Sequence, residues 1–303
     1  MKHLFLINPA AGKYDHTAQI TQKVRALCEP RGLDYAIRVS KQPGDCTRMA
    51  REAAASGSPA HIYACGGDGT LNEVVNGAAG ADNLAVTHFL GGSGNDFIKI
   101  FHKPEAFEDL QALLDDPDET MLDLIQVGED YGVNIVSMGI DARIGTQIQS
   151  LKRLPLLTGH GAYNLSTVVN LLKGIHRHYR LEVDGETIDD RFTLMAVCNG
   201  RFYGGGYQPV PEAMPDDGKL ELLLVKKVSI LQVAGIIGKY KQGLYRQYPT
   251  LFRRISTDRV VIHCDKQEVI NLDGEARWGK DVEIKLSDHK LRFFYPRGLQ
   301  YGV

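Results

Sequence analysis

Apolar and polar positions in the first third of the chain change repeatedly between two periods, which predicts strands and helices in alternation. Short apolar runs bounded by turn residues predict buried strands over residues 3–7, 35–39, 60–65 and 84–90. The segments between them predict helices over residues 15–29, 45–56 and from residue 70 onward. Strands that alternate with helices are typical of a parallel sheet with helices on both faces. We therefore expect an α/β domain with a Rossmann-like parallel sheet.

The pattern changes after residue 118, where turn residues separate many short strands. The predicted strands cover residues 119–127, 131–138, 181–183, 192–198, 218–225, 259–264, 268–272, 282–286 and 291–294. Helices are expected near residues 157–173 and 229–240. A run of strands without alternating helices predicts a second, mainly antiparallel β domain. The boundary between the two domains is expected near residue 120.

Size and composition fit two ordinary globular domains and exclude several classes of protein. The 303 residues are enough for two hydrophobic cores, and 43% apolar with 24% charged residues is usual for a soluble protein. A net charge of −2 gives no general attraction to nucleic acid, so no nucleic-acid partner is expected. No apolar stretch approaches the roughly 18 residues that a membrane-spanning helix needs. The five cysteines contain no C-x-x-C pair and no signal-peptide pattern is visible, which predicts reduced thiols in a cytoplasmic protein.

The motif Gly66-Gly67-Asp68-Gly69-Thr70 carries the most chemical information. It lies between a predicted buried strand and a predicted helix, where glycines permit positive φ and let a ligand approach the backbone. The N–H groups and the positive dipole at the start of the helix favour an anion, most often a phosphate. A carboxylate in a phosphate cradle is repelled unless a cation or a proton-transfer role offsets its charge. Asp68 therefore indicates catalysis rather than simple anion binding.

A structural interpretation of the same motif stays open at this point. Thr70 could cap the helix while Glu73 reaches back three residues later, which would make a capping box next to a tight turn. The motif is not the nucleotide loop of P-loop proteins, because no lysine follows its glycines. Two further polar glycine loops, residues 8–13 and 91–96, follow other predicted strands. Since the carboxyl ends of parallel strands meet at one edge of a sheet, the three loops together favour a ligand site.

Two long segments lack acidic residues although the chain as a whole is nearly neutral. Residues 142–181 and 222–257 contain lysines and arginines but no Asp or Glu. Such runs are usually solvated faces. Between residues 152 and 180 the basic residues also alternate with leucines and a tyrosine, a combination that suits an anionic membrane surface.

Six segments, in this order, give the chain a resemblance to a known family. They are residues 8–12, 66–77, 91–97, 204–206, 214–220 and 273–275, which read NPAAG, GGDGTLNEVVNG, GGSGNDF, GGG, MPDDGKL and DGE. The chain resembles the soluble diacylglycerol kinase-type lipid kinases, a family that includes bacterial members and the sphingosine kinases. The motif GGDG alone is shared with NAD kinases and phosphofructokinases, whereas the full run over residues 66–77 is specific to the lipid kinases.

The resemblance implies a fold, an activity and different tasks for the two domains. Residues 1–120 would form a nucleotide-binding catalytic domain like that of NAD kinase and phosphofructokinase, to which residues 291–303 could return. Residues 121–290 would form an antiparallel β-sandwich that binds the lipid. The implied reaction is transfer of the γ-phosphate of ATP, with Mg²⁺, to a lipid hydroxyl in the cleft between the domains. Conversion of diacylglycerol to phosphatidic acid is the first expectation.

The resemblance also assigns roles to individual residues. Nucleotide contacts would come from Asn8, Pro9, Ala10, Ala11, Gly12, Ser40, Gly66, Gly67, Asp68, Gly69, Thr70, Asn72, Ser93 and Asn95. Ser40 and Ser93 stand where the family often has threonine, and both keep a hydroxyl. The catalytic Mg²⁺ would be organised by Asp68, Asp96 and Asp123. A second, structural Mg²⁺ would be bound by the carboxylate of Asp217 and the carbonyls of Met214 and Lys219, although an Asp-Gly turn would explain that segment as well.

The reaction needs a base, because the hydroxyl of a lipid acceptor has a high pKa. The resemblance points to the segment from Asp273 to Glu275, with Glu275 as the first choice and Asp273 as the alternative. Glu275, Asp273 and Asp68 are thus the candidate catalytic residues. From the residues alone, Asp273-Gly274 could equally be a plain hairpin turn.

Two other functions share part of this pattern. An NAD kinase-like small-molecule kinase would have the first domain and the GGDGT motif, but not the other loops in this order. A catalytically silent lipid- or nucleotide-binding regulator would not need Asp68, Asp96, Asp273 and Glu275 together. A lipid kinase is therefore preferred, acting as a peripheral protein at the inner face of the cell membrane, with a homodimer left open.

Overall fold

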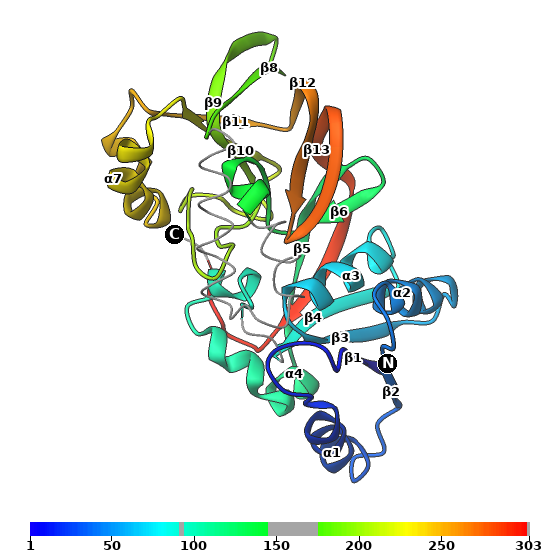
Figure 1. The fold of residues 1–303 in the computed structure, drawn as a ribbon. Helices are drawn as coiled ribbons and strands as arrows, with labels where there is room; N and C mark the ends of the chain where they lie inside the picture. Colours follow the sequence, from blue (N-terminus) through cyan, green and yellow to red (C-terminus); the bar gives the residue numbers. More distant parts are fainter. Residues whose placement is uncertain (91–93, 145–174, 302–303) are drawn as a thin grey trace.

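The computed structural model describes residues 1–90, 94–144 and 175–301, and Figure 1 shows the path of the chain. The first four strands and their helices form the lower part of this view, and the later strands with helix α7 (Ile230–Lys241) form the upper part. The predicted helix over residues 157–173 lies outside the described residues.

The first four strands pair in parallel because the helix after each one returns the chain to the same end of the sheet. They are β1 (Lys2–Ile7), β2 (Tyr35–Val39), β3 (Ala60–Gly66) and β4 (Leu84–Leu90), in the order β4-β3-β1-β2. The connecting helices are α1 (Thr17–Cys28), α2 (Asp45–Ala55) and α3 (Asp68–Ala78). Short helices follow β4, namely η1 (Phe97–Ile100), η2 (Pro104–Glu108) and α4 (Leu110–Asp115).

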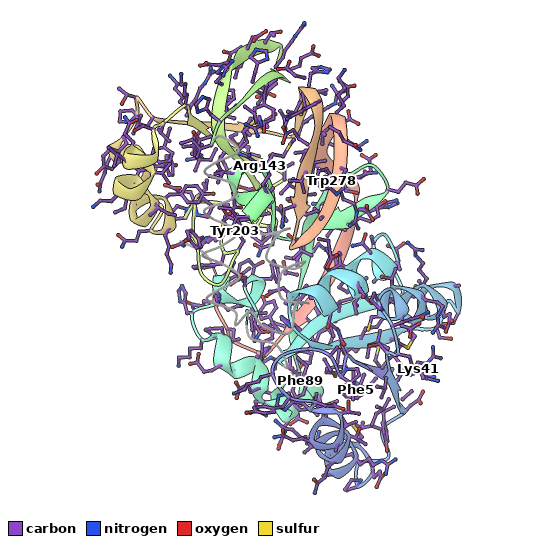
Figure 2. The ribbon with its side chains drawn as sticks, in the orientation of Figure 1. Phe5, Lys41, Phe89, Arg143, Tyr203 and Trp278 are labelled. Atoms are coloured by element: carbon purple, nitrogen blue, oxygen red, sulfur yellow. The ribbon has the colours of Figure 1, made fainter. Side chains whose placement is uncertain are left out.

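Helices cover both faces of this parallel region because successive side chains of a strand point to opposite faces. On β1, Leu4 and Leu6 belong to the core formed with α2 and α3. Phe5 and Ile7 point the other way and belong to the core formed with α1 and α4. Phe5 is fully buried there, and its side chain is labelled in Figure 2. The predicted mixed α/β fold is confirmed.

The later strands pair almost entirely in antiparallel fashion. They are β5 (Asp118–Val127), β6 (Asp130–Gly132), β7 (Ile135–Gly139), β8 (Arg177–Val183), β9 (Glu186–Cys198), β10 (Leu220–Lys226), β11 (Phe252–Thr257), β12 (Arg259–Leu272) and β13 (Glu275–Tyr295). Strands β9 and β12 each pair with β8 along one half and with β7 along the other. One apolar core contains side chains of β5, β7–β10, β12 and β13. A second core lies between α7 and residues of β7, β9, β10 and β11. The turn helix η3 (Tyr245–Gln247) precedes β11.

In the described residues the two regions are joined in one mixed sheet of 13 strands, and the last strand returns to the N-terminal sheet as the resemblance implied. The connection is β13, which pairs antiparallel with β12 and β5 and then parallel with β4 through Phe293 and Val86. Figure 1 shows β13 running from the upper region down to β4. The C-terminal part of the chain thereby completes the N-terminal sheet.

Several element boundaries differ from the sequence-based prediction. The predicted strand over residues 131–138 is divided into β6 and β7, and the backbone between them serves the site described below. Residues 259–272 form one strand rather than two, with a register shift between His263 and Glu268 that accounts for the polar interruption. Helix α3 begins at Asp68, two residues before the predicted start. Strand β11 and helix α4 were not predicted.

In the described part of the chain, no helix has the length and apolar character needed to cross a membrane.

Candidate active site

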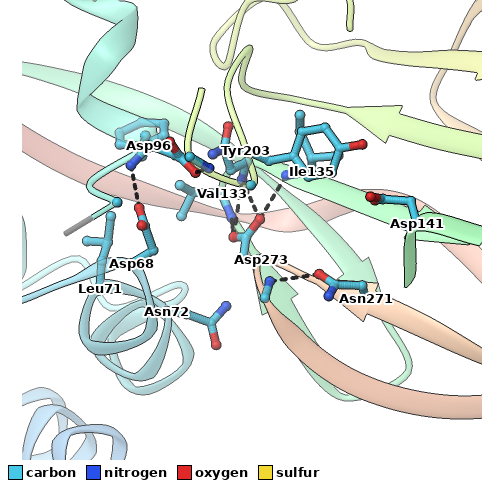
Figure 3. Close-up of a pocket in the computed structure, with 16 residues that line it drawn as sticks. Asp68, Leu71, Asn72, Asp96, Val133, Ile135, Asp141, Tyr203, Asn271 and Asp273 are labelled. Carbon is cyan, nitrogen blue, oxygen red and sulfur yellow. Dashed lines mark hydrogen bonds between the residues drawn. The ribbon is translucent and has the colours of Figure 1, made fainter. Parts of the chain in front are cut away.

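A pocket of about 430 Å³ lies where the two regions meet (Figure 3). The N-terminal region contributes the start of α3 and the segment before η1. The later strands contribute the β6–β7 connection, the β12–β13 turn and the glycine loop around residues 203–205. Four carboxylates from segments far apart in the sequence, those of Asp68, Asp96, Asp141 and Asp273, line this one pocket.

Asp68 occupies the first turn of α3, directly after the glycines. Its Oδ1 accepts a hydrogen bond from the backbone N–H of Asp96 at 2.5 Å. A Cβ at Gly94 would lie 2.3 Å from its Oδ2, so a larger residue there would displace the Asp68 carboxylate. Burial raises the pKa of the Asp68 carboxyl, and the nearby Asp96 carboxylate raises it further. The charge of Asp68 is thus only partly compensated by the protein.

Asp96 connects the two sides of the pocket. One carboxylate oxygen forms an ion pair with Lys99 one helical turn later. The other accepts a hydrogen bond from the backbone N–H of Gly205 at 2.8 Å. Asp96 therefore fixes the glycine loop of the later strands against the N-terminal region.

Asp273 and Gly274 form the two-residue turn between β12 and β13, with φ values of 49° and 96°. Positive φ at both positions is typical of a type I′ hairpin turn, for which Asp-Gly is a favoured pair. Asp273 and Gly274 do form a hairpin turn, but the turn does not explain the position of the Asp273 side chain. That side chain points back toward the β6–β7 connection instead of into solvent (Figure 3).

The Asp273 carboxylate accepts hydrogen bonds from three consecutive backbone N–H groups. Oδ2 lies 2.7 Å from the N of Val133, Oδ1 lies 2.8 Å from the N of Ile135, and the N of Asn134 is 3.2 Å from both oxygens. Burial raises the pKa of Asp273 to about 6, with a further increase from the Asp68 carboxylate, although the three donors oppose the rise. Asp273 is held rigidly by the backbone that separates β6 from β7.

Glu275 begins β13 one residue beyond the turn, and its side chain is exposed. It does not line the pocket with Asp273. Its Oε1 lies 4.0 Å from the position that a Cβ at Gly69 would occupy, so its carboxylate faces the glycine motif at the start of α3. The structure thus brings the DGE and GGDGT segments together across some 200 residues of sequence.

The first glycine loop lies beside the same motif. Asn8 donates from Nδ2 to the hydroxyl of Thr70 at 3.1 Å, and its Oδ1 accepts from the N–H of Ala10 at 3.0 Å. A Cβ at Gly66 would lie 2.2 Å from the Thr70 hydroxyl oxygen, which explains the glycine at that position. Gly12 has a φ of 76° at the end of the loop.

The proposed capping box at Thr70 and Glu73 is wrong. In the described residues, no side chain caps the start of α3. Glu73 instead accepts hydrogen bonds from the N–H groups of Gly44 at 2.9 Å and Cys46 at 3.0 Å, at the start of helix α2. The N-terminal end of α3 is consequently left to face the loop that carries Asn8.

The remaining candidates for nucleotide contacts lie around this group. Ser40 is buried at the end of β2, where its N–H donates to the carbonyl of Ile7 at 2.9 Å, next to Asn8. Asn72 lines the pocket and donates to the carbonyl of Tyr131 at 3.2 Å. Asn95 has a φ of 48°, and Ser93 lies outside the described residues.

Asp123 is not one of the carboxylates that line the pocket. Its side chain is 1% exposed, with one oxygen 2.7 Å from the Lys290 ammonium and the other 2.7 Å from the backbone N of Gly218. Its own N–H donates to the carbonyl of Pro215 at 2.7 Å. Asp123 therefore belongs with the loop over residues 214–219, and the expected cluster of Asp68, Asp96 and Asp123 does not form as one group.

The loop over residues 214–219 carries the other predicted metal ligands. Asp217 accepts a hydrogen bond from the N–H of Lys219 at 3.0 Å, and the sulfur of Met214 lies 2.8 Å from a guanidinium nitrogen of Arg201. Burial raises the pKa of Asp217, and the carboxylates of Glu221 and Asp123 add to that effect. Negative charge thus gathers at this loop.

The carboxylates of the pocket supply the oxygen donors that Mg²⁺ prefers. The raised pKa of Asp68 shows a negative charge that a cation would stabilise. Nowhere in the described residues do three or more His, Cys, Asp or Glu side chains form a group that could hold a metal ion. The site therefore fits a Mg²⁺ ion that keeps water and substrate oxygens in its shell, not a preformed protein cage.

The sequence analysis did not identify Asp141 and Tyr203, which line the end of the pocket away from Asp68 (Figure 3). Asp141 accepts a hydrogen bond from the Ser137 hydroxyl at 2.9 Å, and burial raises the pKa of its carboxyl. Asp141 lies three residues after a predicted strand, near the strand ends where several site residues lie. That position was the signal in the sequence that could have found it.

Two family models together match nearly the whole chain. The diacylglycerol kinase catalytic domain matches residues 2–127, and the YegS C-terminal NAD kinase beta sandwich-like domain matches residues 134–294. A protein of Chromohalobacter salexigens named "Probable lipid kinase YegS-like" is 37% identical, and the alignment covers 95% of this chain and 92% of that protein. The predicted C-terminal β-sandwich-like domain is confirmed.

Solved structures share the fold at lower identity. A crystal structure described as a diacylglycerol kinase from Bacillus anthracis has a TM-score of 0.71 and 20% identity, and the match covers 99% of this chain and 98% of that one. A second structure from the same organism has a TM-score of 0.75 and 22% identity, with the same coverage. At this level of identity the likeness concerns the fold alone.

Proposed function

Because the chain belongs to the diacylglycerol kinase-like lipid kinases, we propose that it transfers the γ-phosphate of ATP to a lipid hydroxyl, converting diacylglycerol to phosphatidic acid. One observation carries this proposal: carboxylates from both regions of the chain face the glycine-rich start of α3. Phosphoryl transfer depends mainly on positioning and charge compensation, and this arrangement supplies both.

We assign the nucleotide to the N-terminal region, taken as a Rossmann-like domain of residues 1–120 with residues 291–303, and the lipid to residues 121–290. The backbone of residues 8–12 and 66–70 would surround the phosphates, since Gly12, Gly66, Gly67 and Gly69 carry no Cβ that would keep a ligand away. The uncapped start of α3 would add its positive dipole end to the same place. Thr70 would be held for this role by its hydrogen bond from Asn8.

Glu275 is the proposed base. In the transfer, the acceptor oxygen forms a bond to the γ-phosphorus, the bond to the β–γ bridging oxygen breaks, and the hydroxyl proton passes to the Glu275 carboxylate. Glu275 is exposed and faces Gly69, so a lipid hydroxyl can reach it. Asp273 is the weaker candidate because its oxygens already accept from three backbone N–H groups. Asp273 is better suited to fix the turn that positions Glu275.

Mg²⁺ would supply charge compensation for the phosphates when it is bound beside Asp68 and Asp96. A second, structural Mg²⁺ is proposed at the loop over residues 214–219, with the Asp217 carboxylate and the carbonyls of Met214 and Lys219 as ligands. Asp217 supports a cation there, because burial raises the pKa of its carboxyl, whereas Asp123 and Glu221 are already paired with Lys290 and Arg254. Because the lipid chains stay in a bilayer, the enzyme would work as a peripheral protein at the inner membrane surface.

The test is transfer of labelled phosphate from ATP to dispersed diacylglycerol, with and without EDTA. We expect labelled phosphatidic acid with Mg²⁺ only. Glu275→Gln should lower kcat by about 10²–10⁴-fold, the usual contribution of a general base, while nucleotide binding persists. Asp273→Asn serves as the comparison. Normal turnover in Glu275→Gln together with loss in Asp273→Asn would move the base to Asp273.

A further inference from the structure

Helix α7 carries two apolar side chains that remain exposed in the part of the chain that the structure describes. Its inner side packs through Val233, Ile236 and Tyr240, which follow the helical spacing of three and four residues. Leu231, on the opposite side of the helix, is 86% exposed. Ile237, which is 42% exposed, lies about 120° around the helix from Leu231, at the edge of the packed side. A capping box between Ser229 and Gln232 fixes the start of the helix, so this face has a defined orientation.

The outer face of α7 is also flat. Gly235 and Gly238 follow Leu231 at positions i+4 and i+7, so they lie on the same side of the helix. A Cβ at either glycine would meet no atom within 4 Å, so internal packing does not require glycine there. Glycine disfavours a helix, and two such positions on an exposed face are explained by a surface that approaches the helix closely.

Basic residues flank this face without acidic neighbours. Lys226 and Lys227 precede the helix, and Lys239 and Lys241 lie in its last turn. Within the described residues, none of these lysines forms an ion pair with a carboxylate, whereas Arg246, Arg253 and Arg254 farther along are paired with glutamates. Exposed apolar side chains next to lysines without ion-pair partners suit an anionic lipid bilayer, which has an apolar interior beneath negatively charged headgroups.

The same helix is connected to the pocket. The Tyr240 hydroxyl lies 2.8 Å from that of Tyr203, which lines the pocket. The carbonyl of Lys241 accepts a hydrogen bond from the N–H of Gln208 at 2.9 Å. Between these two contacts lies the glycine loop whose Gly205 bonds to Asp96. A surface that holds α7 therefore also holds the loop that forms one wall of the pocket.

We propose that α7 docks the protein on an anionic lipid bilayer, with Leu231 and Ile237 inserted at the interface and the flanking lysines on the headgroups. This inference rests on the proposed function, because a lipid acceptor explains why the docking helix is tied to the pocket. It places membrane contact on a helix different from the basic segment of residues 152–180, most of which lies outside the described residues.

The first experiment measures retention of the full chain on vesicles of phosphatidylcholine with and without phosphatidylglycerol. The wild type should bind the anionic vesicles, and high salt should weaken binding. Leu231→Ser with Ile237→Ser should lower the partition coefficient about tenfold or more, since two apolar side chains no longer insert. Met121→Ser is the matched control, because Met121 on β5 is 44% exposed. Equal losses in the control, or no loss in the α7 variant, would overturn the proposal.

A second experiment reports directly on α7. Trp278 is the only tryptophan of the chain and lies on β13, apart from α7 (Figure 2). In a protein with Trp278→Phe and Leu231→Trp, emission should shift to the blue when anionic vesicles are added. No shift would overturn docking through α7. A blue shift that instead follows protein concentration without vesicles would assign the face to a second copy of the chain and also overturn the proposal.

Failure of docking and failure of the proposed function give different results. Wild-type transfer to a short-chain, water-soluble diacylglycerol tests the kinase without any vesicle. Activity there, with no vesicle binding by α7, would leave the kinase and remove the docking surface. Vesicle binding without any phosphate transfer would leave the docking surface and remove the proposed kinase activity.

Discussion

Asp68, Asp96 and Asp123, which the sequence analysis assigned to one Mg²⁺ ion, lie in two different places, and the protein compensates their charges differently. In the pocket, Asp68 is half-buried beside Asp96, and desolvation together with the Asp96 carboxylate raises the pKa of Asp68. At the loop over residues 214–219, Asp123 is neutralised by Lys290 and by the backbone N–H of Gly218. The first set holds negative charge ready for a ligand, and the second uses its charge to fix one segment to another.

Functional and structural carboxylates can be told apart by their effect on the stability of the fold. An ionised group whose pKa is raised by burial and by a like charge destabilises the fold, which a protein retains where the charge is needed. A buried carboxylate with a cation and an N–H donor stabilises its surroundings, and removing it leaves those partners unsatisfied. Substitution of Asp68 should therefore lower activity more than stability, and substitution of Asp123 should lower stability more than activity.

The largest effect is expected for Asp68→Asn. Without the carboxylate, kcat should fall by about 10²–10³-fold, the size associated with loss of a group that organises transition-state charge. The free energy of unfolding should stay equal or rise, because a neutral side chain avoids both burial of charge and repulsion by Asp96. Kinetics and urea unfolding measure the two quantities, with the exposed Asp82→Asn as control. A clear loss of stability with retained kcat would reverse the assignment of Asp68.

Asp123→Asn should lower the stability of the protein and leave its activity nearly unchanged. We expect a decrease of about 3 kcal/mol in the free energy of unfolding, since the Lys290 ammonium and the N–H of Gly218 lose their charged acceptor. The activity of the folded fraction should change little. In a double-mutant cycle with Lys290→Met, the double variant should be more stable than the sum of the two single effects predicts. Simple additivity would show that the pair is not coupled.

The smallest effect concerns the pH dependence of Asp273. Its folded pKa of about 6 lies above the usual value near 4, so the folded carboxyl keeps its proton where the unfolded one has lost it. This group therefore lowers the free energy of unfolding as pH rises from about 4 to 6, with no further change above. The free energy of unfolding of the wild type, minus that of Asp273→Asn, should decrease as pH rises over that window. A difference that grows with pH would contradict the raised pKa.

The fold was predictable where local pattern and tertiary environment agree. The strands over residues 35–39 and 84–90 were predicted with the boundaries that the structure has, because short apolar runs between turn residues have one favourable state. The long strands β12 and β13 were each divided in the prediction, since a polar bulge inside a strand resembles a turn in the sequence. The continuous sheet depends on the pairing of β13 with β4, which no local pattern specifies.

The site was predictable to the extent that its residues follow strands or turns. Asp68 and Asp273 were found from motifs at such positions, and the structure brings both to one pocket. The place of Asp123 depends on Lys290, more than 160 residues later, so its separation from Asp68 could not be read from spacing. Glu73 has a good position for a capping box, yet it serves a different helix because α2 lies next to α3.

The most direct test of the central claim is a competition between acceptors. The purified protein is given labelled ATP and Mg²⁺ with a mixture of diacylglycerol in anionic vesicles and NAD, and the labelled products are separated. We predict label in phosphatidic acid, loss of that label in Asp68→Asn and Glu275→Gln, and none in the dinucleotide. Label in the dinucleotide, or lipid label that persists in both variants, would contradict the account.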